Sequence, residues 1–240
     1  CALAAGVSTI VERIAMTRAA SNLKDGIDWV IASNRGMVPL VQTTIDPSRI
    51  TSIYNGVDVD LIRSARPDRL GFDPTDVIVG RVSRVGRGKN LQLLVQAMVQ
   101  VIRIYPNAKL VIVGDRTRRE DYEDIWPELR RLAKPLERSV IFTGEIDQPF
   151  DIIAGFDIAT CVSIPENEGI PNSLIEPMAL GKPVVSTNTG QVSELVDHDV
   201  NGLLVPCDDL GALICALERL IQDPDLRVKF GHAAQRKVIS

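Results

Sequence analysis

The fold is indicated most clearly by residues 76–115, which read DVIVGRVSRVGRGKNLQLLVQAMVQVIRIYPNAKLVIVGD. The runs at 76–83 and 108–115 are short and rich in valine and isoleucine, a composition that favours buried strands. Between them, residues 90–105 carry apolar side chains at helical spacing. We therefore predict a strand, a helix and a second strand, which is the unit of a parallel sheet.

The same rhythm continues toward the end of the chain. Apolar runs at 139–144, 157–163, 182–187 and 201–206 alternate with helix-like runs at 118–133, 148–156 and 209–223, and another helix opens near Ser173. Strands this apolar are typically covered on both faces, and alternating helices make the sheet parallel with right-handed crossovers. The sequence thus predicts an α/β protein with a doubly wound, Rossmann-like parallel sheet over residues 77–240.

Residues 1–58 differ, with strands predicted at 7–15, 28–34 and 49–56 and a helix at 35–44. This segment is small for an independent domain, so we interpret it as the remnant of a second α/β domain. The polar stretch that follows predicts a linker at 59–76. The chain begins at Cys1 rather than Met and stops within a helical pattern, so we expect a fragment that lacks material at its ends.

The composition excludes several classes of protein. Hydrophobic residues make up 45% of the 240 residues and charged residues 24%, which argues against disorder. A net charge of −4 argues against a nucleic-acid surface. The four cysteines form no Cys-x-x-Cys pair, and no apolar run approaches the roughly 20 residues that span a bilayer. We expect a soluble cytoplasmic protein with reduced thiols.

Ligands of an open parallel sheet bind beyond the carboxyl ends of its strands, so the loops there are the first candidates. The loop SRVGRGKN, residues 83–90, carries Arg84, Arg87 and Lys89 among glycines, which favours phosphate, although a solvated basic turn is an equal alternative. A P-loop is excluded because Ser83 and Asn90 occupy its first glycine and its hydroxyl positions. The glycine spacing also fails the dinucleotide fingerprint.

A second candidate loop is IPENEGIPN, residues 164–172, followed by the helical run SLIEPMAL. The free N–H groups of a helix start favour an anion here. Ser173 and Glu176 also form a capping-box pattern, so Glu176 has a purely structural alternative. Glu168 lies next to Gly169 at the ligand edge, where a carboxylate is well placed to accept hydrogen bonds from hydroxyls.

Two other patterns suggest metals, but weakly. Asp58-Val59-Asp60 has a form that can hold a metal through a nucleotide diphosphate, yet it lies on a polar turn away from the candidate loops. His198 and His232 have no nearby ligands at metal-binding spacing, so we interpret them as a turn residue and a helix-surface residue. The sequence therefore predicts no metal site.

Several segments together resemble one family. EGIPNSLIEPMALGKPVVST, ELVDHDVNGLLVPCDD and DPDLRVKFG resemble the donor-binding half of retaining GT-B glycosyltransferases of family 4, the glycosyl transferases group 1. IYNGVD is similar to that family's junction between its two halves, and SRVGRGKNLQLLVQA to its first donor-side loop and helix. The resemblance covers roughly residues 50–235, and residues 1–58 would then be the tail of an acceptor-side domain.

The resemblance also implies roles for residues of this chain. The family carries two glutamates separated by seven residues, and Glu168 and Glu176 fit that spacing. Glu168 would contact the transferred sugar and Glu176 the ribose, while Arg84 and Lys89 would bind the diphosphate and stabilise the leaving group. The remaining donor-binding positions that the resemblance implies are Gly169, Ile170, Pro171, Asn172, Ser173 and Leu174.

The implied activity is transfer of a hexose, with retention, from a UDP-, GDP- or ADP-sugar to a glycan or lipid acceptor, without metal or cofactor. Any peripheral membrane contact would be made by the missing N-terminal half. Two features depart from the family pattern. Gly114-Asp115-Arg116-Thr117 stands where the family usually has a Gly-x-Gly turn, and Arg81 is an alternative to Arg84 as the match to the family's diphosphate-binding arginine. The alternatives are a nucleotide-sugar-binding module without transferase activity and a dehydrogenase-type Rossmann domain.

Overall fold

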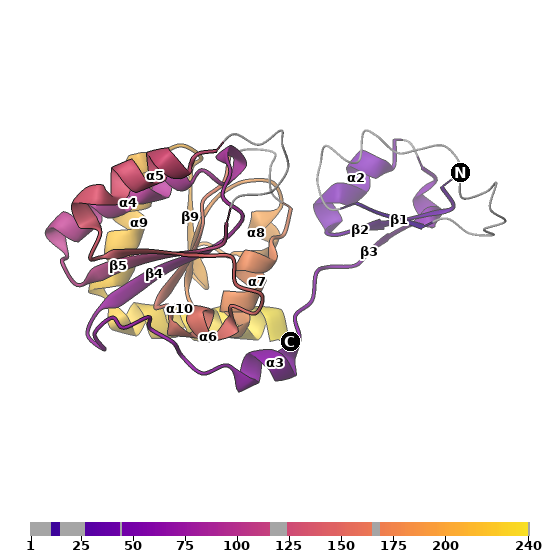
Figure 1. Ribbon diagram of the computed structural model, residues 1–240. Helices are drawn as coiled ribbons and strands as arrows, with labels where there is room; N and C mark the ends of the chain where they lie inside the picture. The colour runs from indigo at the N-terminus through magenta and orange to yellow at the C-terminus, as the bar shows by residue number, and fades with distance from the viewer. Residues whose placement is uncertain (1–10, 15–26, 44, 116–123, 165–168, 240) are drawn as a thin grey trace.

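The computed structural model describes residues 11–14, 27–43, 45–115, 124–164 and 169–239. Its strands form two parallel sheets, one of three strands and one of six (Figure 1). The smaller has the order β1-β2-β3, with β1 at Val11–Ile14, β2 at Trp29–Ala32 and β3 at Ile50–Ser52. The larger has the order β6-β5-β4-β7-β8-β9. Its strands are β4 Val77–Val82, β5 Ala108–Val113, β6 Val140–Gly144, β7 Ile158–Cys161, β8 Val184–Thr187 and β9 Gly202–Val205.

Helices cover both faces of the six-stranded sheet (Figure 1). One layer contains α4 (Leu91–Ile104), α5 (Trp126–Ala133) and α9 (Leu210–Gln222), and the other contains α6 (Phe150–Gly155), α7 (Asn172–Ala179), α8 (Val192–Leu195) and α10 (Pro224–Ile239). Along β4, Val77 and Val79 pack in the first layer and Ile78 in the second. This alternation explains why the strand is apolar throughout, and it confirms the predicted doubly wound α/β fold.

Helix α4, the first helix that packs on this sheet, buries the apolar face that its sequence pattern predicts. Leu91, Leu94, Met98 and Val101 of α4 are completely buried, and their spacing places them on one face of the helix. On the opposite layer, a Cβ at Gly80 would lie 2.1 Å from the ring of Phe156. Glycine at this position of β4 therefore lets the end of α6 pack directly onto the strand.

The N-terminal segment contains the three predicted strands in shorter form. The predicted helix at 35–44 is a 3₁₀ turn, η2 (Arg35–Met37), followed by one turn of α-helix, α2 (Val38–Val41). A small core of Val30, Ala32, Met37 and Val41 holds this sheet to α2. Another 3₁₀ turn, η3 (Pro47–Arg49), leads into β3.

Residues 59–76, predicted as a linker, contain a helix, α3 (Val59–Ser64). Asp58 begins it, because its Oδ1 accepts a hydrogen bond of 3.0 Å from the Leu61 N–H. The polar turn expected at Asp58-Val59-Asp60 is therefore wrong: Asp58 is an N-cap residue. After α3 the chain is extended or turned until β4.

Cys161, Cys207 and Cys215 are free cysteines. In the described parts of the chain, no helix has the length and apolar character needed to cross a bilayer.

Candidate functional site

The strand order of the larger sheet reverses between β4 and β7. From β4 the chain continues outward through β5 and β6, and from β7 it continues in the opposite direction through β8 and β9. In doubly wound sheets, ligands bind at the carboxyl edge where the loops leave the strands on either side of such a reversal, here β4 and β7. The two loops also touch, because the Ile164 N–H donates a hydrogen bond of 3.3 Å to the Gly88 carbonyl oxygen.

The loop after β4 is fixed by bonds on two sides. The Val85 N–H donates to the carbonyl oxygen of Asp115 at 2.9 Å. Asn90 adopts a left-handed conformation with φ 42°, and its Nδ2 donates to Asp208 Oδ1 at 2.7 Å. The loop thus has a defined path between β4 and the first turn of α4.

The three cations predicted to bind phosphate lie on this fixed loop. Arg84 and Arg87 are exposed, and Lys89 is half-buried at the end of the 3₁₀ turn η4 (Arg87–Lys89). Arg84 thus lies two residues after the end of β4, and Lys89 lies two residues before the start of α4. The site therefore has a concentration of positive charge on a chain whose net charge is negative.

The end of β5 approaches this loop more closely than any side chain would permit. Gly114 has a φ of 129°, and a Cβ there would lie 2.0 Å from the Ser83 carbonyl oxygen. The chain lacks the family's Gly-x-Gly turn, but Gly114 occupies the position of the first glycine of that turn, and the close approach to Ser83 requires a glycine there. Arg116 and Thr117, the other half of this departure, lie outside the described residues.

Arg81, the alternative to Arg84 as the family's diphosphate-binding arginine, lies inside the protein. Its side chain is 1% exposed, and its Nη1 donates to the Thr160 carbonyl oxygen at 3.0 Å and to Ser173 Oγ at 3.4 Å. The guanidinium therefore connects β4, β7 and the first turn of α7. Its guanidinium therefore adds positive charge close to the start of α7.

The start of α7 differs from the predicted capping box. The helix begins at Asn172, its N-cap residue is Pro171, and no side chain caps it. Ser173 lies inside the first turn, where its hydroxyl accepts from Arg81 rather than from a helix N–H. The capping-box interpretation of Ser173 and Glu176 is therefore wrong, because the N-cap is the extended Pro171, two residues before Ser173.

This helix start leaves backbone donors for an anion. The Leu174 N–H already donates to the Pro171 carbonyl oxygen at 3.0 Å, and Pro171 has no N–H of its own. Asn172 and Ser173 precede it and, as at any helix start, have no intrahelical acceptor. Gly169 and Ile170 are buried just before the helix, and the side chain of Leu174 is fully buried beneath it.

Glu176 is half-buried in α7, and burial raises the pKa of its carboxyl group. In the described ranges no donor pairs with this carboxylate. A carboxylate held in this way has a cost in stability and a spare capacity for hydroxyl donors. Glu168, its predicted companion, lies outside the described residues.

Asn55 contacts the candidate site, although the sequence assigned no role to it. Its Nδ2 donates to the Ile170 carbonyl oxygen at 3.1 Å, so the segment that follows β3 contacts the loop before α7. The sequence pattern IYNGVD contains Asn55, but it indicated only the junction between the two halves of the family's fold. The contact partner is 115 residues away in sequence and could not be read from the pattern.

The weak metal patterns have structural explanations. Asp58 caps α3, and His198 accepts a hydrogen bond of 3.0 Å at Nδ1 from the Leu204 N–H. His232 lies exposed on α10, as predicted. Across the described ranges, no group of three or more His, Cys, Asp or Glu side chains has metal-binding geometry.

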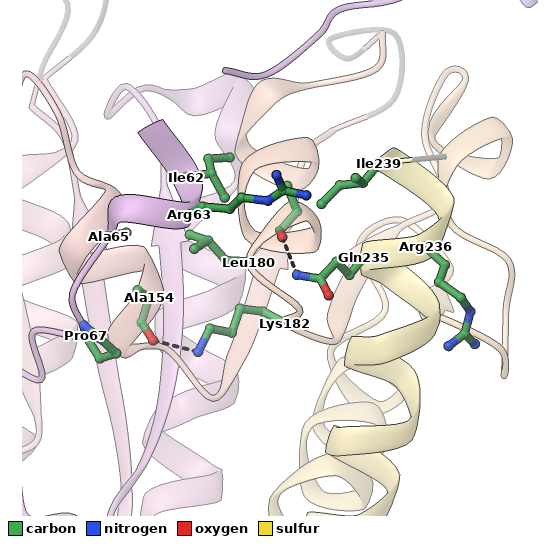
Figure 2. A pocket seen from close by; sticks show the side chains of 11 residues that line it. Ile62, Arg63, Ala65, Pro67, Ala154, Leu180, Lys182, Gln235, Arg236 and Ile239 are labelled. Atoms are coloured by element: carbon green, nitrogen blue, oxygen red, sulfur yellow. Dashed lines mark hydrogen bonds between the residues drawn. The ribbon is translucent and has the colours of Figure 1, made fainter. Parts of the chain in front are cut away.

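A separate cavity of about 660 Å³ is lined by residues from α3, α6, α7 and α10 (Figure 2). Lys182 lies in it, donating from Nζ to the Ala154 carbonyl oxygen at 2.6 Å, and burial lowers its pKa. Gln235 donates to the Ala179 carbonyl oxygen at 2.9 Å. Ala154 and Lys182 precede β7 and β8, so this cavity lies at the amino edge of the sheet, away from the switch point.

Known proteins resemble this chain over most of its length. A protein of Campylobacter jejuni, N-acetylgalactosamine-N,N'-diacetylbacillosaminyl-diphospho-undecaprenol 4-alpha-N-acetylgalactosaminyltransferase, is 27% identical over 88% of this chain and 55% of its own length. A GDP-mannose-dependent monoacylated alpha-(1-6)-phosphatidylinositol monomannoside mannosyltransferase of Corynebacterium glutamicum is 31% identical over 77% and 50%. The chain thus spans about half the length of these curated relatives.

Similarity of structure agrees with similarity of sequence. The crystal structure of Anabaena Alr3699/HepE in complex with UDP and glucose superposes with a TM-score of 0.83 and 25% identity, covering 98% of this chain and 67% of that one. The family model described as Glycosyl transferases group 1 matches residues 73–223, which include both candidate loops. This chain belongs to the group 1 glycosyltransferases and has the α/β architecture of their GT-B fold.

Proposed function

We propose that this chain is the donor-binding part of a retaining glycosyltransferase of family 4, which transfers a hexose from a nucleotide-diphosphate sugar to a glycan or lipid acceptor. One observation carries the proposal: the basic loop after β4 meets the loop that precedes the uncapped start of α7 at the switch point. Both features favour an anion, and they lie where a parallel sheet binds its ligand.

The proposed roles follow from position. Arg84 and Lys89 bind the donor diphosphate, together with the backbone N–H groups of Asn172 and Ser173. Glu176 accepts hydrogen bonds from ribose hydroxyls, which would use a carboxylate that the described residues leave without a donor. Glu168 contacts hydroxyls of the transferred sugar. The backbone N–H groups of Gly169 and Ile170 add to the same anion site. Pro171 has no N–H, and the Leu174 N–H donates to the Pro171 carbonyl oxygen, so these two residues shape the helix start.

In the proposed reaction, the bond between the anomeric carbon and the terminal phosphate oxygen breaks, and its electron pair leaves with the nucleoside diphosphate. The acceptor hydroxyl forms its bond on the same face of the sugar, and its proton passes to the departing phosphate oxygen. Arg84 and Lys89 stabilise the negative charge that develops on the phosphate, so the barrier to leaving falls.

Names of relatives support a nucleotide sugar but leave the base open. The mannosyltransferase of Corynebacterium glutamicum is named as GDP-mannose-dependent, whereas the Anabaena structure contains UDP and glucose. The shared chemistry is a hexose linked to a nucleoside diphosphate. Since the named relatives are transferases, we favour a transferase over a module that only binds nucleotide sugars.

The proposal also includes the organisation and setting of the protein. We assign residues 1–58 to the acceptor-side domain, 59–76 to the linker and 77–240 to the donor-binding domain. The free cysteines at 161, 207 and 215 support a reducing, cytoplasmic location. Acceptor binding, and any contact with a membrane, would be made mainly by parts of the protein beyond this chain.

Calorimetric titration with a nucleoside diphosphate and with its sugar conjugate tests the two glutamates. Glu176→Gln should weaken both ligands, because ribose loses a charged acceptor. Glu168→Gln should leave the nucleotide almost unchanged and reduce the preference for the sugar conjugate by about 1–2 kcal/mol, the scale of a hydrogen bond to a charged group. Equal losses for both ligands in both variants would contradict the separate roles.

A further inference from the structure

Glu194 on α8 binds three donors from the first 54 residues of the chain. Its Oε1 accepts from the Gly36 N–H at 2.8 Å. Its Oε2 accepts from the Arg35 N–H at 3.3 Å and from the Tyr54 hydroxyl at 2.5 Å. One half-buried carboxylate on α8 thus connects to two separate N-terminal segments, which follow β2 and β3.

The first segment is the start of η2, directly after β2. Asn34 Oδ1 already caps this turn by accepting from the Met37 N–H at 3.0 Å, and Glu194 takes the two N–H groups between them. The approach is close: a Cβ at Gly36 would lie 2.5 Å from Gln191 Cγ and 2.9 Å from Glu194 Oε1. Glycine at position 36 therefore permits α8 to reach the backbone of the other sheet.

The second segment is Tyr54-Asn55, which leaves β3. Tyr54 bonds to Glu194, and its neighbour Asn55 bonds to the Ile170 carbonyl oxygen in the loop before α7. Two adjacent residues thus connect the N-terminal sheet to α8 and to the proposed donor loop. Tyr54, Asn55, Ile170 and Glu194 line a cavity of about 260 Å³, so hydrogen bonds contribute to the geometry of this junction beside the close approach at Gly36.

We propose that Glu194, Tyr54 and Asn55 are positioning residues that fix the N-terminal sheet against the donor-side sheet and connect this orientation to the donor loop. The contact between the sheets stands on its own geometry, whereas its effect on donor binding rests on the proposed function. When the N–H groups of Arg35 and Gly36 and the hydroxyl of Tyr54 bind Glu194, the turn after β2 lies beside the carboxyl edge of the larger sheet. This is the edge where, in the proposed function, the acceptor hydroxyl must meet the nucleotide sugar.

Titration of the tyrosine hydroxyl reports on this contact directly. Burial, followed by the hydrogen bond to Glu194, raises the pKa of Tyr54. The charge of Glu194 opposes the phenolate, so Glu194→Gln should lower this pKa while keeping the size of the side chain. The measurement is a ¹³C NMR titration of labelled tyrosine, with Tyr54→Phe to assign the signal. Glu137→Gln, at an exposed glutamate on the same chain, is the matched control.

The same variants test orientation and coupling. We expect Glu194→Gln to increase the radius of gyration in small-angle scattering, and Asn55→Ala to weaken binding of nucleoside diphosphate several-fold without moving the Tyr54 signal. An unchanged Tyr54 titration or an unchanged radius of gyration in Glu194→Gln would overturn the positioning role. Failure of the proposed function is a different result: wild-type protein would then bind no nucleotide, while the Tyr54 shift would persist.

Discussion

The Ile164 N–H donates a hydrogen bond of 3.3 Å to the Gly88 carbonyl oxygen, so the two loops at the switch point of the sheet are in direct contact. Gly88 lies between Arg87 and Lys89 on the basic loop, and Ile164 begins the loop that leads to α7. A ligand that binds one loop must therefore affect the other. We expect diphosphate and sugar recognition to be coupled through this contact.

Lys89→Ala should weaken nucleoside-diphosphate binding about tenfold or more, because a hydrogen bond to a charged group contributes roughly 1.5–3 kcal/mol. It should also flatten the dependence of affinity on salt, since one cation near the phosphates is lost. Titration calorimetry at low and moderate salt measures both effects. Lys229→Ala, at an exposed lysine of α10, is the control and should change neither.

Gly114→Ala should destabilise the protein by about 2 kcal/mol or more, because a φ of 129° disfavours any side chain and the new Cβ would meet the Ser83 carbonyl oxygen. The displaced loop carries Arg84, so nucleotide binding should weaken as well. Urea denaturation measures the stability. Gly56→Ala is the matched control, since a Cβ there meets nothing within 4 Å, and equal stabilities of the two variants would contradict the close approach.

Glu176→Gln should stabilise the protein at neutral pH while it weakens nucleotide binding. The folded protein holds this carboxyl at a raised pKa, so the stability it contributes is fully present below the unfolded pKa and is lost as pH rises through the folded pKa. The advantage of the glutamine variant should therefore appear at pH 7 and vanish near pH 3. A lower stability than wild type at pH 7 would indicate an unrecognised structural partner.

Donor binding should be insensitive to EDTA. Arg84 and Lys89 supply the positive charge that a divalent cation would otherwise bring to the diphosphate, and Asp58 is used as the N-cap of α3. Nucleotide titrations with EDTA and with added Mg²⁺ or Mn²⁺ should give the same affinity. Strict dependence on either ion would show that the diphosphate site is incomplete without it.

The larger sheet could be predicted well because its strands are marked by local composition. Residues such as Val77, Val79, Leu110 and Ile112 belong to uninterrupted apolar runs, and α4 has a clear helical period. The short helices were harder to predict from the sequence, because they contain too few residues to show a helical period. Val59–Ser64 contains only six residues, and its Asp58 cap looked like part of a polar turn. Pro39 lies inside the predicted helix at 35–44, which is described as two short turns.

The site could be predicted only in part, because several of its features depend on contacts distant in sequence. Ser173 matched a capping box, but Pro171 starts the helix and Arg81 takes the serine hydroxyl. The burial of Arg81 depends on Thr160 and Ser173, which lie 79 and 92 residues away. No local pattern indicates such a partner.

Mapping nucleotide binding onto the backbone amides by two-dimensional NMR tests the location of the donor site most directly. On addition of UDP, GDP or ADP, we predict that the largest shifts occur at residues 84–90 and 169–176, for whichever nucleotide binds. Residues around Lys182 and Gln235, which line the cavity of Figure 2, should change little. Shifts centred on that cavity, with residues 84–90 unaffected, would contradict a donor site at the β4–β7 switch point.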